Sequence, residues 1–146
     1  MTQTAATEEN KNAVRTILLG TLIVLLAMGT RATFGLFMQP MGLEFGWPRE
    51  VFSMAFAIQN LVWGVGAIGA GMMADRFGSA RTIALCAVFY AVGLIGTRLS
   101  TSVFELYMSA GVLIGLGQAG TTFAVILPVI ARTVPVSSRS TAMGIA

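Results

Sequence analysis

The sequence predicts an all-α integral membrane protein with four transmembrane helices and the start of a fifth. Of its 146 residues, 55% are hydrophobic and only 10% are charged, whereas a soluble domain has about 25% charged residues. The uncharged stretches are also long, and about 20 apolar residues are enough to cross the roughly 30 Å hydrocarbon core of a bilayer. Lipid rather than water is therefore the expected surrounding for most of this chain.

Two uncharged stretches define the clearest spans. The stretch between Glu50 and Asp75 contains 24 uncharged residues, and the stretch between Glu105 and Arg132 contains 26. Each is long enough to cross the bilayer with some tilt. These stretches predict the second and fourth helices.

The first and third spans are shorter or carry a charge. Between Arg81 and Arg98 lie 16 uncharged residues, and an arginine at each end can extend its stem to the interface. The first span contains Arg31. A secretory signal peptide is the alternative for this segment, but three more spans follow and no small-residue cleavage pattern closes it. The expected helices are about residues 16–38, 51–74, 81–99 and 104–131, with the start of a fifth at 140–146.

The basic residues predict the orientation, because they are enriched in cytoplasmic loops. A cytoplasmic N-terminus leaves Arg49 and Arg98 outside and places six basic residues inside. These six are Lys11, Arg15, Arg76, Arg81, Arg132 and Arg139. The hairpins then join helix one to two outside, two to three inside, and three to four outside.

Several classes of function lack the residues they need. No histidine is present and Cys86 is the only cysteine, so Cys/His metal sites, disulfide frameworks and histidine-dependent catalysis are disfavoured. The nine basic residues are scattered singly and form no patch for nucleic acid. We therefore expect no enzyme, no metal or cofactor and no nucleic-acid partner.

The loop between the second and third spans carries the most specific pattern. It reads Gly-Met-Met-Ala-Asp-Arg-Phe-Gly-Ser-Ala-Arg from Gly71 to Arg81. Gly71 lets another helix approach closely, and Gly78 permits a tight turn. Asp75 caps helix ends, while the arginines hold the loop at the cytoplasmic surface. The alternative is an ordinary loop with positive-inside arginines.

This loop resembles the G-x-x-x-D-R-x-G-x-x-R loop of the major facilitator superfamily. The resemblance implies a fold of two six-helix halves with the substrate between them, of which this chain is part of the N-terminal half. Residues 1–15 are then a cytoplasmic tail, and residues 16–146 a partial transporter domain in the bacterial inner membrane. The loop is implied to latch onto the other half through Gly71, Asp75, Arg76, Gly78 and Arg81.

A further resemblance narrows the subgroup. The segment Arg31–Phe37, followed by Pro40 and Gly46–Glu50, is similar to bacterial relatives of the monocarboxylate and oxalate:formate transporters. It implies transport of a small organic anion, monocarboxylate-like, by alternating access. The stretch Gly111–Gly117 lacks the arginine that drug antiporters carry before a Q-G-x-G pattern, which disfavours drug export. Ala13–Thr16 also lacks the acidic, glycine-rich opening of eukaryotic monocarboxylate carriers.

Arg31 is the candidate for binding the anion. It lies about 15 residues into the first span, roughly two thirds of the way across. An arginine at this depth costs about 2.5 kcal/mol or more unless it faces a cavity or a partner. Its guanidinium can bind a carboxylate through two charge-assisted hydrogen bonds. The alternative is that the side chain extends to the outer interface.

Polar residues of the fourth span are further candidates. Gln118, Thr121 and Thr122 lie within about one turn and could bind the substrate in the cavity, or could join neighbouring helices. Gln59 and Asn60 in the second span have the same ambiguity, and we do not assign them to the site. The lipid bilayer and the small organic anion are thus the expected partners.

Glycines are concentrated in the apolar spans. They form small-residue faces, which permit close contact between helices. They are Gly64, Gly66, Gly69 and Gly71 in the second span and Gly111, Gly115, Gly117 and Gly120 in the fourth.

Two interpretations of the chain's length stay open. It is either a truncated or frameshifted copy, or a unit that assembles with missing C-terminal helices or other subunits. A non-transporting membrane scaffold or an inactive remnant is the alternative function. A small multidrug carrier working as a dimer of four-helix subunits normally needs an acidic residue in the membrane, and no Asp or Glu lies deep in a span.

Overall fold

The structure is a computed structural model that describes residues 2–121, 125–126 and 128, and these residues form helices joined by short loops. Four segments are long and apolar enough to cross a membrane: Val14–Leu36, Arg49–Phe77, Ser79–Leu99 and Val103–Thr121. The prediction of an all-α protein with four membrane spans is confirmed. The start of a fifth helix at 140–146 lies outside the described residues. The elements are α1 (Thr2–Phe45), α2 (Arg49–Phe77), α3 (Ser79–Leu99), α4 (Val103–Leu106), the π-helical segment η1 (Tyr107–Leu113) and α5 (Ile114–Thr121).

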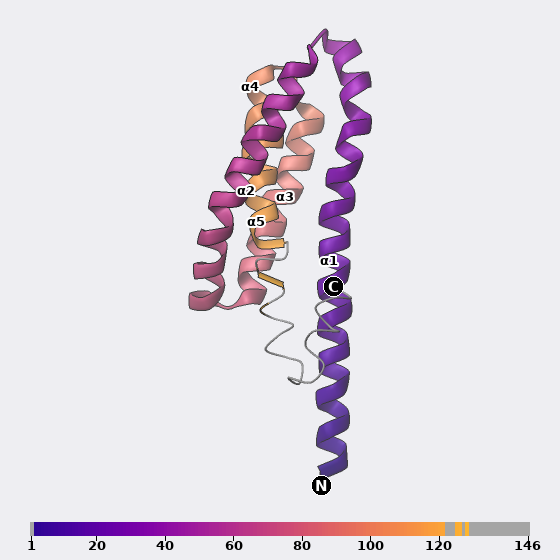
Figure 1. The fold of residues 1–146 in the computed structure, drawn as a ribbon, viewed down its shortest axis with the longest axis vertical. Coiled ribbons are helices and arrows are strands. Elements are labelled where there is room, and N and C mark those ends of the chain that lie inside the picture. The colour runs from indigo at the N-terminus through magenta and orange to yellow at the C-terminus, as the bar shows by residue number, and fades with distance from the viewer. Residues whose placement is uncertain (1, 122–124, 127, 129–146) are drawn as a thin grey trace.

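Helix α1 extends beyond the expected span at both ends. It has 44 residues, which at about 1.5 Å per residue makes roughly 66 Å, twice the thickness of the hydrocarbon core. It projects past the other helices at its N-terminal end (Figure 1). It also continues through Pro40, which removes one backbone N–H donor, the one that would bond to the carbonyl of Leu36, a loss that membrane-spanning helices tolerate more often than soluble ones. Charge spacing marks where a helix enters lipid, and it does not mark where the helix stops.

The helices are connected at two opposite ends of the bundle (Figure 1). Residues 46–48 join α1 to α2, and residues 100–102 join α3 to α4, at what we call the Trp47 end. Gly78 alone joins α2 to α3 at the other end, which we call the Gly78 end. Gly78 has φ +92°, a conformation that residues with a side chain rarely adopt. The expected tight turn at Gly78 is therefore present.

A capping box opens the fourth span. The Ser102 hydroxyl accepts the Glu105 backbone N–H at 3.3 Å, and the Glu105 carboxylate accepts the Ser102 N–H at 3.2 Å. This reciprocal pair satisfies donors that a helix start leaves without partners. The Glu105 carboxylate therefore serves as a cap at the Trp47 end.

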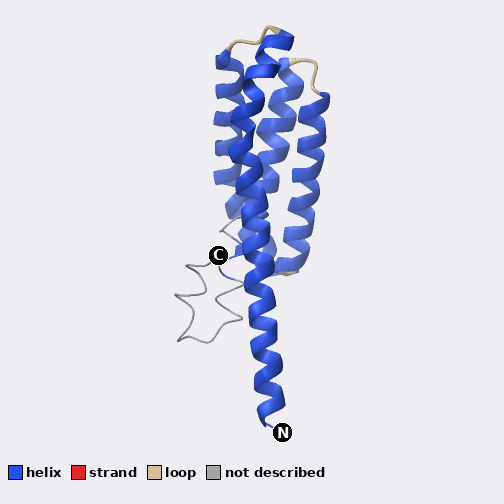
Figure 2. Ribbon diagram, turned by 90° about the vertical axis from the view of Figure 1, so that its right-hand side faces the viewer, coloured by secondary structure: helices blue, strands red, loops and turns tan. Residues whose placement is uncertain are grey.

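The fourth span, formed by α4, η1 and α5, packs against both α2 and α3, and the helices run side by side in one bundle (Figure 2). Of its apolar window 56% is buried, against 17% for the window of α1. Its buried side chains Leu106 and Ile114 meet Phe52 of α2 in one cluster. The sequence predicted a regular helix here, whereas Tyr107–Leu113 is π-helical, a wider form that shifts the following residues around the helix axis.

Glycines allow this close packing. A Cβ atom on Gly115 would lie 2.9 Å from the backbone oxygen of Gln59 in α2, and one on Gly117 would lie 2.6 Å from the backbone nitrogen of Tyr90 in α3. A real Cβ does not come that close to backbone atoms, so the absent side chain is what lets these helices touch. By contrast, a Cβ on Gly64 would have no described atom within 4 Å.

Gly117→Ala should destabilise the bundle, because the new methyl group overlaps the backbone of Tyr90 and must push α3 away. We expect a loss of about 1–3 kcal/mol in the free energy of unfolding, measured by thermal unfolding in detergent micelles. Gly64→Ala is the matched control. It should leave stability unchanged or raise it by up to about 1 kcal/mol, because alanine favours helix. Equal effects of the two substitutions would contradict the packing described.

Candidate functional site

The guanidinium of Arg31 points from α1 toward α2 and α5. Its Nη2 donates to Oδ1 of Asn60 at 2.6 Å, and its Nη1 donates to Oε1 of Gln118 at 3.4 Å. Gln118 is fully buried, with 0% of its surface exposed. The side chain of Arg31 is thus held by neighbouring helices and does not extend along α1 to the interface. Of the predicted site residues, Arg31 and Gln118 are brought together.

Two aromatic rings of α2 flank the same guanidinium. The Cζ atom of Arg31 lies 5.1 Å from the ring centre of Trp63 and 5.8 Å from that of Phe56. These distances are within the range of cation–π attraction, about 6 Å. Phe34 of α1 packs edge-on against Phe56, with ring centres 5.1 Å apart. The electron-rich ring faces therefore stabilise the cation.

Asn60 is oriented by its own helix. Its Nδ2 donates to the backbone oxygen of Phe56 at 2.9 Å, which turns its oxygen toward Arg31. Because the amide nitrogen is already used, the amide presents an acceptor, and not a donor, to the guanidinium. Tyr90 adds a tie between α3 and α1, donating its hydroxyl to the backbone oxygen of Ala27 at 3.0 Å.

The positive charge of Arg31 has only neutral partners among the described side chains. Arg31 lies 14 residues before the end of α1 at Phe45, about 21 Å along the axis. The acidic side chains that the structure describes lie at helix ends: Glu44, Glu50, Asp75 and Glu105. A guanidinium has five N–H donors, and two of them are used here. The arrangement can therefore accept an anion.

The two threonines are placed differently. Thr121 is buried, and its hydroxyl donates to the backbone oxygen of Gly117 at 2.9 Å within its own helix. That hydroxyl is therefore engaged by the helix in this structure, and a contact with substrate stays a prediction. Thr122 lies outside the described residues.

Sequence reasoning did not assign three residues that surround Arg31, namely Phe56, Asn60 and Trp63. For Asn60, the sequence offered one indication, namely its depth in the membrane relative to Arg31. It lies 11 residues after the start of α2, and Arg31 lies 14 residues before the end of α1, both counted from the Trp47 end. A polar amide and an arginine at similar depths on consecutive helices are expected to meet, but which faces turn toward each other is a tertiary property.

The loop at the Gly78 end displays its charged residues to the surroundings. Asp75, Arg76 and Arg81 are exposed, and Arg76 lies over the ring of Phe77 at 5.3 Å. A Cβ on Gly71 would have no described atom within 4 Å. This end therefore offers an open small-residue surface beside exposed charges.

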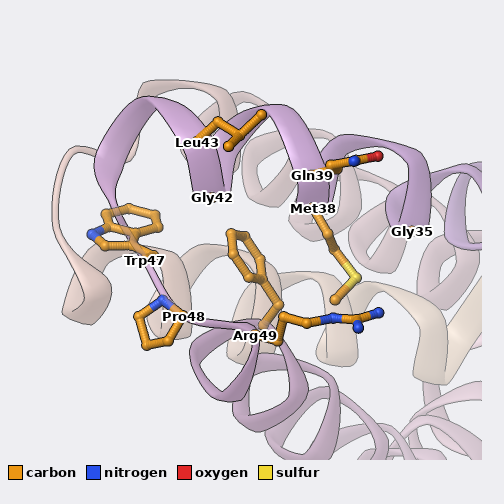
Figure 3. Close-up of a pocket in the computed structure, with 9 residues that line it drawn as sticks. Gly35, Met38, Gln39, Gly42, Leu43, Trp47, Pro48 and Arg49 are labelled. Carbon is orange, nitrogen blue, oxygen red and sulfur yellow. The ribbon is translucent and has the colours of Figure 1, made fainter.

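A cavity of about 550 Å³ lies between α1 and α2 at the Trp47 end (Figure 3). Its walls are largely apolar, and Arg49 is the cation among the described residues that line it. The lining residues are Gly35, Met38, Gln39, Gly42, Leu43, Trp47, Pro48, Arg49 and Phe52. In the described part of the chain, no group of three or more His, Cys, Asp or Glu side chains could hold a metal ion.

Four apolar helices, with one charge held between them, define a multi-pass membrane protein. The family model of the Major Facilitator Superfamily matches residues 20–146, so the chain belongs to this family of transporters. It is also 29% identical over 101 residues to an Escherichia coli (strain K12) protein named "Uncharacterized MFS-type transporter YhjX". That match covers 69% of this chain and 25% of the relative, so the chain spans about a quarter of the relative's length. No solved structure matches the chain.

Asn60→Leu should destabilise the chain, because it leaves the Arg31 guanidinium without its shortest hydrogen bond. A hydrogen bond to a charged group contributes about 1.5–3 kcal/mol where it is shielded. Because Asn60 is exposed in this structure, we expect a smaller loss, about 0.5–1.5 kcal/mol, in thermal unfolding. Asn60→Asp is the control, since it keeps an acceptor and adds a compensating charge, and it should be at least as stable as the parent. If Asn60→Leu unfolds at the same temperature as the parent, the hydrogen bond between Arg31 and Asn60 does not stabilise the fold.

Proposed function

We propose that the chain is the N-terminal part of a secondary transporter that moves a small organic anion, monocarboxylate-like, by alternating access. The observation that carries this proposal is Arg31, whose charge lies within a membrane span and is surrounded by neutral acceptors. A structural arginine at such depth is usually paired with an acidic side chain or with backbone carbonyls. An arginine that has only amides and rings around it keeps its full positive charge, so it attracts an incoming anion more strongly than an arginine already paired with a carboxylate.

A carboxylate can bind here through the N–H donors that Arg31 has left. Such a charge-assisted, two-pronged pair is stronger than a hydrogen bond to a neutral amide, and it gains further because little water screens it. Gln118 already contacts the guanidinium, so it can contact the bound anion as well. Thr121 and Thr122 are proposed as further contacts on the same turn of the fourth span.

The rest of the transport path is assigned to the part of a full-length transporter that residues 1–146 do not cover. Within the proposal, the N-terminus is cytoplasmic, the membrane is the bacterial inner membrane, and the Trp47 end faces outside. The loop residues Asp75, Arg76 and Arg81, with Gly71 and Gly78, then form a latch for the C-terminal half. The open surface at Gly71 supports such a contact. A non-transporting scaffold would use the Arg31 contacts only to hold α1 against α2 and α5, and the N–H donors that remain on Arg31 would have no role in it.

Anion binding at Arg31 can be measured through Trp63, whose ring lies 5.1 Å from the guanidinium. The chain has two tryptophans, so Trp47→Phe leaves Trp63 as the reporter. Titration with lactate or formate in lipid nanodiscs should change Trp63 emission in a saturable way. Arg31→Gln should weaken binding at least tenfold, since a charge-assisted pair is worth about 1.5–3 kcal/mol and about 1.4 kcal/mol is tenfold. Lactamide, which has lactate's shape without its charge, is the ligand control. An unchanged titration in Arg31→Gln, or an equal response to lactamide, would remove anion binding from Arg31.

Uptake of labelled lactate into proteoliposomes tests completeness separately. This chain alone should be inert, whereas the full-length E. coli relative provides the comparison with a complete path. Transport by the chain alone would replace the fragment interpretation by a self-assembling small carrier.

A further inference from the structure

We propose that the cavity at the Trp47 end is a second anion-binding subsite, centred on Arg49. It lies along the same contact between α1 and α2 as Arg31, and we call this contact the seam. The inference rests on the proposed function for the class of ligand, a small organic carboxylate. It adds a site at the other end of this seam, formed by residues that the Arg31 cluster does not use. Three observations carry it: the continuity of two helix faces, the space between them and the charge at its rim.

The α1 side of the seam is one continuous face. Arg31, Gly35, Met38 and Gly42 follow one another at intervals of four, three and four residues, so they lie along one side of the helix. The last three line the cavity. Gly35, its deepest residue on α1, is one turn from Arg31. The face that forms the cavity therefore leads directly to the guanidinium.

The α2 side mirrors this arrangement. Arg49 and Phe52 line the cavity, and Phe56 and Asn60 follow at intervals of four residues on the same face. Phe56 contacts Arg31 on one side and Phe34 on the other. This aromatic pair marks the boundary between the cavity and the Arg31 cluster.

The two glycines of α1 that line the cavity act differently. A Cβ on Gly35 would have no described atom within 4 Å, so Gly35 borders open space, whereas one on Gly42 would lie 3.2 Å from the backbone oxygen of Trp47, so Gly42 allows a close approach of the chain there. The resulting volume of about 550 Å³ lies within the usual range for small-molecule sites, about 300–1,000 Å³. A side chain at Gly35 would project into this volume.

The cavity combines one cation, Arg49, with walls that are apolar over more than half of their surface and that also include the amide of Gln39. Arg49 lies below Met38 in the view of the cavity (Figure 3), and Phe52 also lines it. Glu44 and Glu50 are close in sequence but do not line it. A positive group over apolar walls favours a small anion with an apolar part, and like charge repels cations. A monocarboxylate fits this description, with its carboxylate on Arg49 and its apolar part against Trp47 and Phe52.

The two tryptophans allow the two sites to be followed separately. Trp63→Phe leaves Trp47, which lines the cavity, and Trp47→Phe leaves Trp63, which lies beside Arg31. Titration with lactate in nanodiscs should give a saturable change in both variants. Arg49→Gln should weaken binding seen by Trp47 at least fivefold and leave binding seen by Trp63 within twofold. Arg49 is exposed, so this substitution should not disturb folding.

Gly35→Leu tests the space without altering charge, and it should weaken binding seen by Trp47 at least fivefold. Gly29→Leu is its control, because Gly29 is also surrounded by open space and lies on a different side of α1, about 200° from Arg31 at 100° per residue. It should leave binding within twofold. A response of Trp63 alone, or a Trp47 response unchanged by Arg49→Gln, overturns the subsite and leaves the proposed function standing. A response of Trp47 alone overturns anion binding at Arg31 and leaves the subsite standing.

Discussion

The charge of Arg31 is the constraint on which the placement of α1 depends. A guanidinium within a membrane span must find polar or aromatic partners, and α1 buries only 17% of its apolar window against the described chain. The contacts with Asn60 and Gln118 bind α1 to α2 and α5 within the first span. The need for these contacts therefore decides which face of α1 turns toward the bundle. Gly35, Met38 and Gly42 lie on the same face of α1 as Arg31, so they line the cavity.

The partners of Arg31 are in position because the fourth span is packed so tightly. Gly115 and Gly117 let its backbone touch α2 and α3, which buries Gln118 fully at the centre of the bundle. A buried amide has few rotamers available, so its oxygen is presented to Arg31 with little loss of side-chain entropy. The fourth span therefore has two roles. Its glycines pack against α2 and α3, and the same packing positions Gln118 beside Arg31.

Neutral acceptors give the cluster a property that a carboxylate partner would remove. An Asp or Glu beside Arg31 would neutralise it and compete with any incoming anion, whereas amides and rings stabilise the cation and leave its charge in place. Asn60 shows how an amide is oriented for this role. Its nitrogen donates to the backbone oxygen of Phe56, so its oxygen faces Arg31. The cation is therefore stabilised without a carboxylate partner, which is what the proposed anion site requires.

The sequence by itself determined the class of fold and the residue around which the site forms. Span lengths follow from bilayer thickness, and Arg31 stands out because a charge in lipid is costly. Gln118 could be named from its type and depth, but Thr121, of similar type and depth, hydrogen-bonds its own helix. Only the tertiary structure decided that Asn60, Phe56 and Trp63 surround Arg31, that Tyr107–Leu113 is π-helical, and that a cavity opens beside Gly35. The physical reason is that hydropathy depends on each residue alone, whereas helix rotation and contact depend on the shapes of all neighbouring faces together.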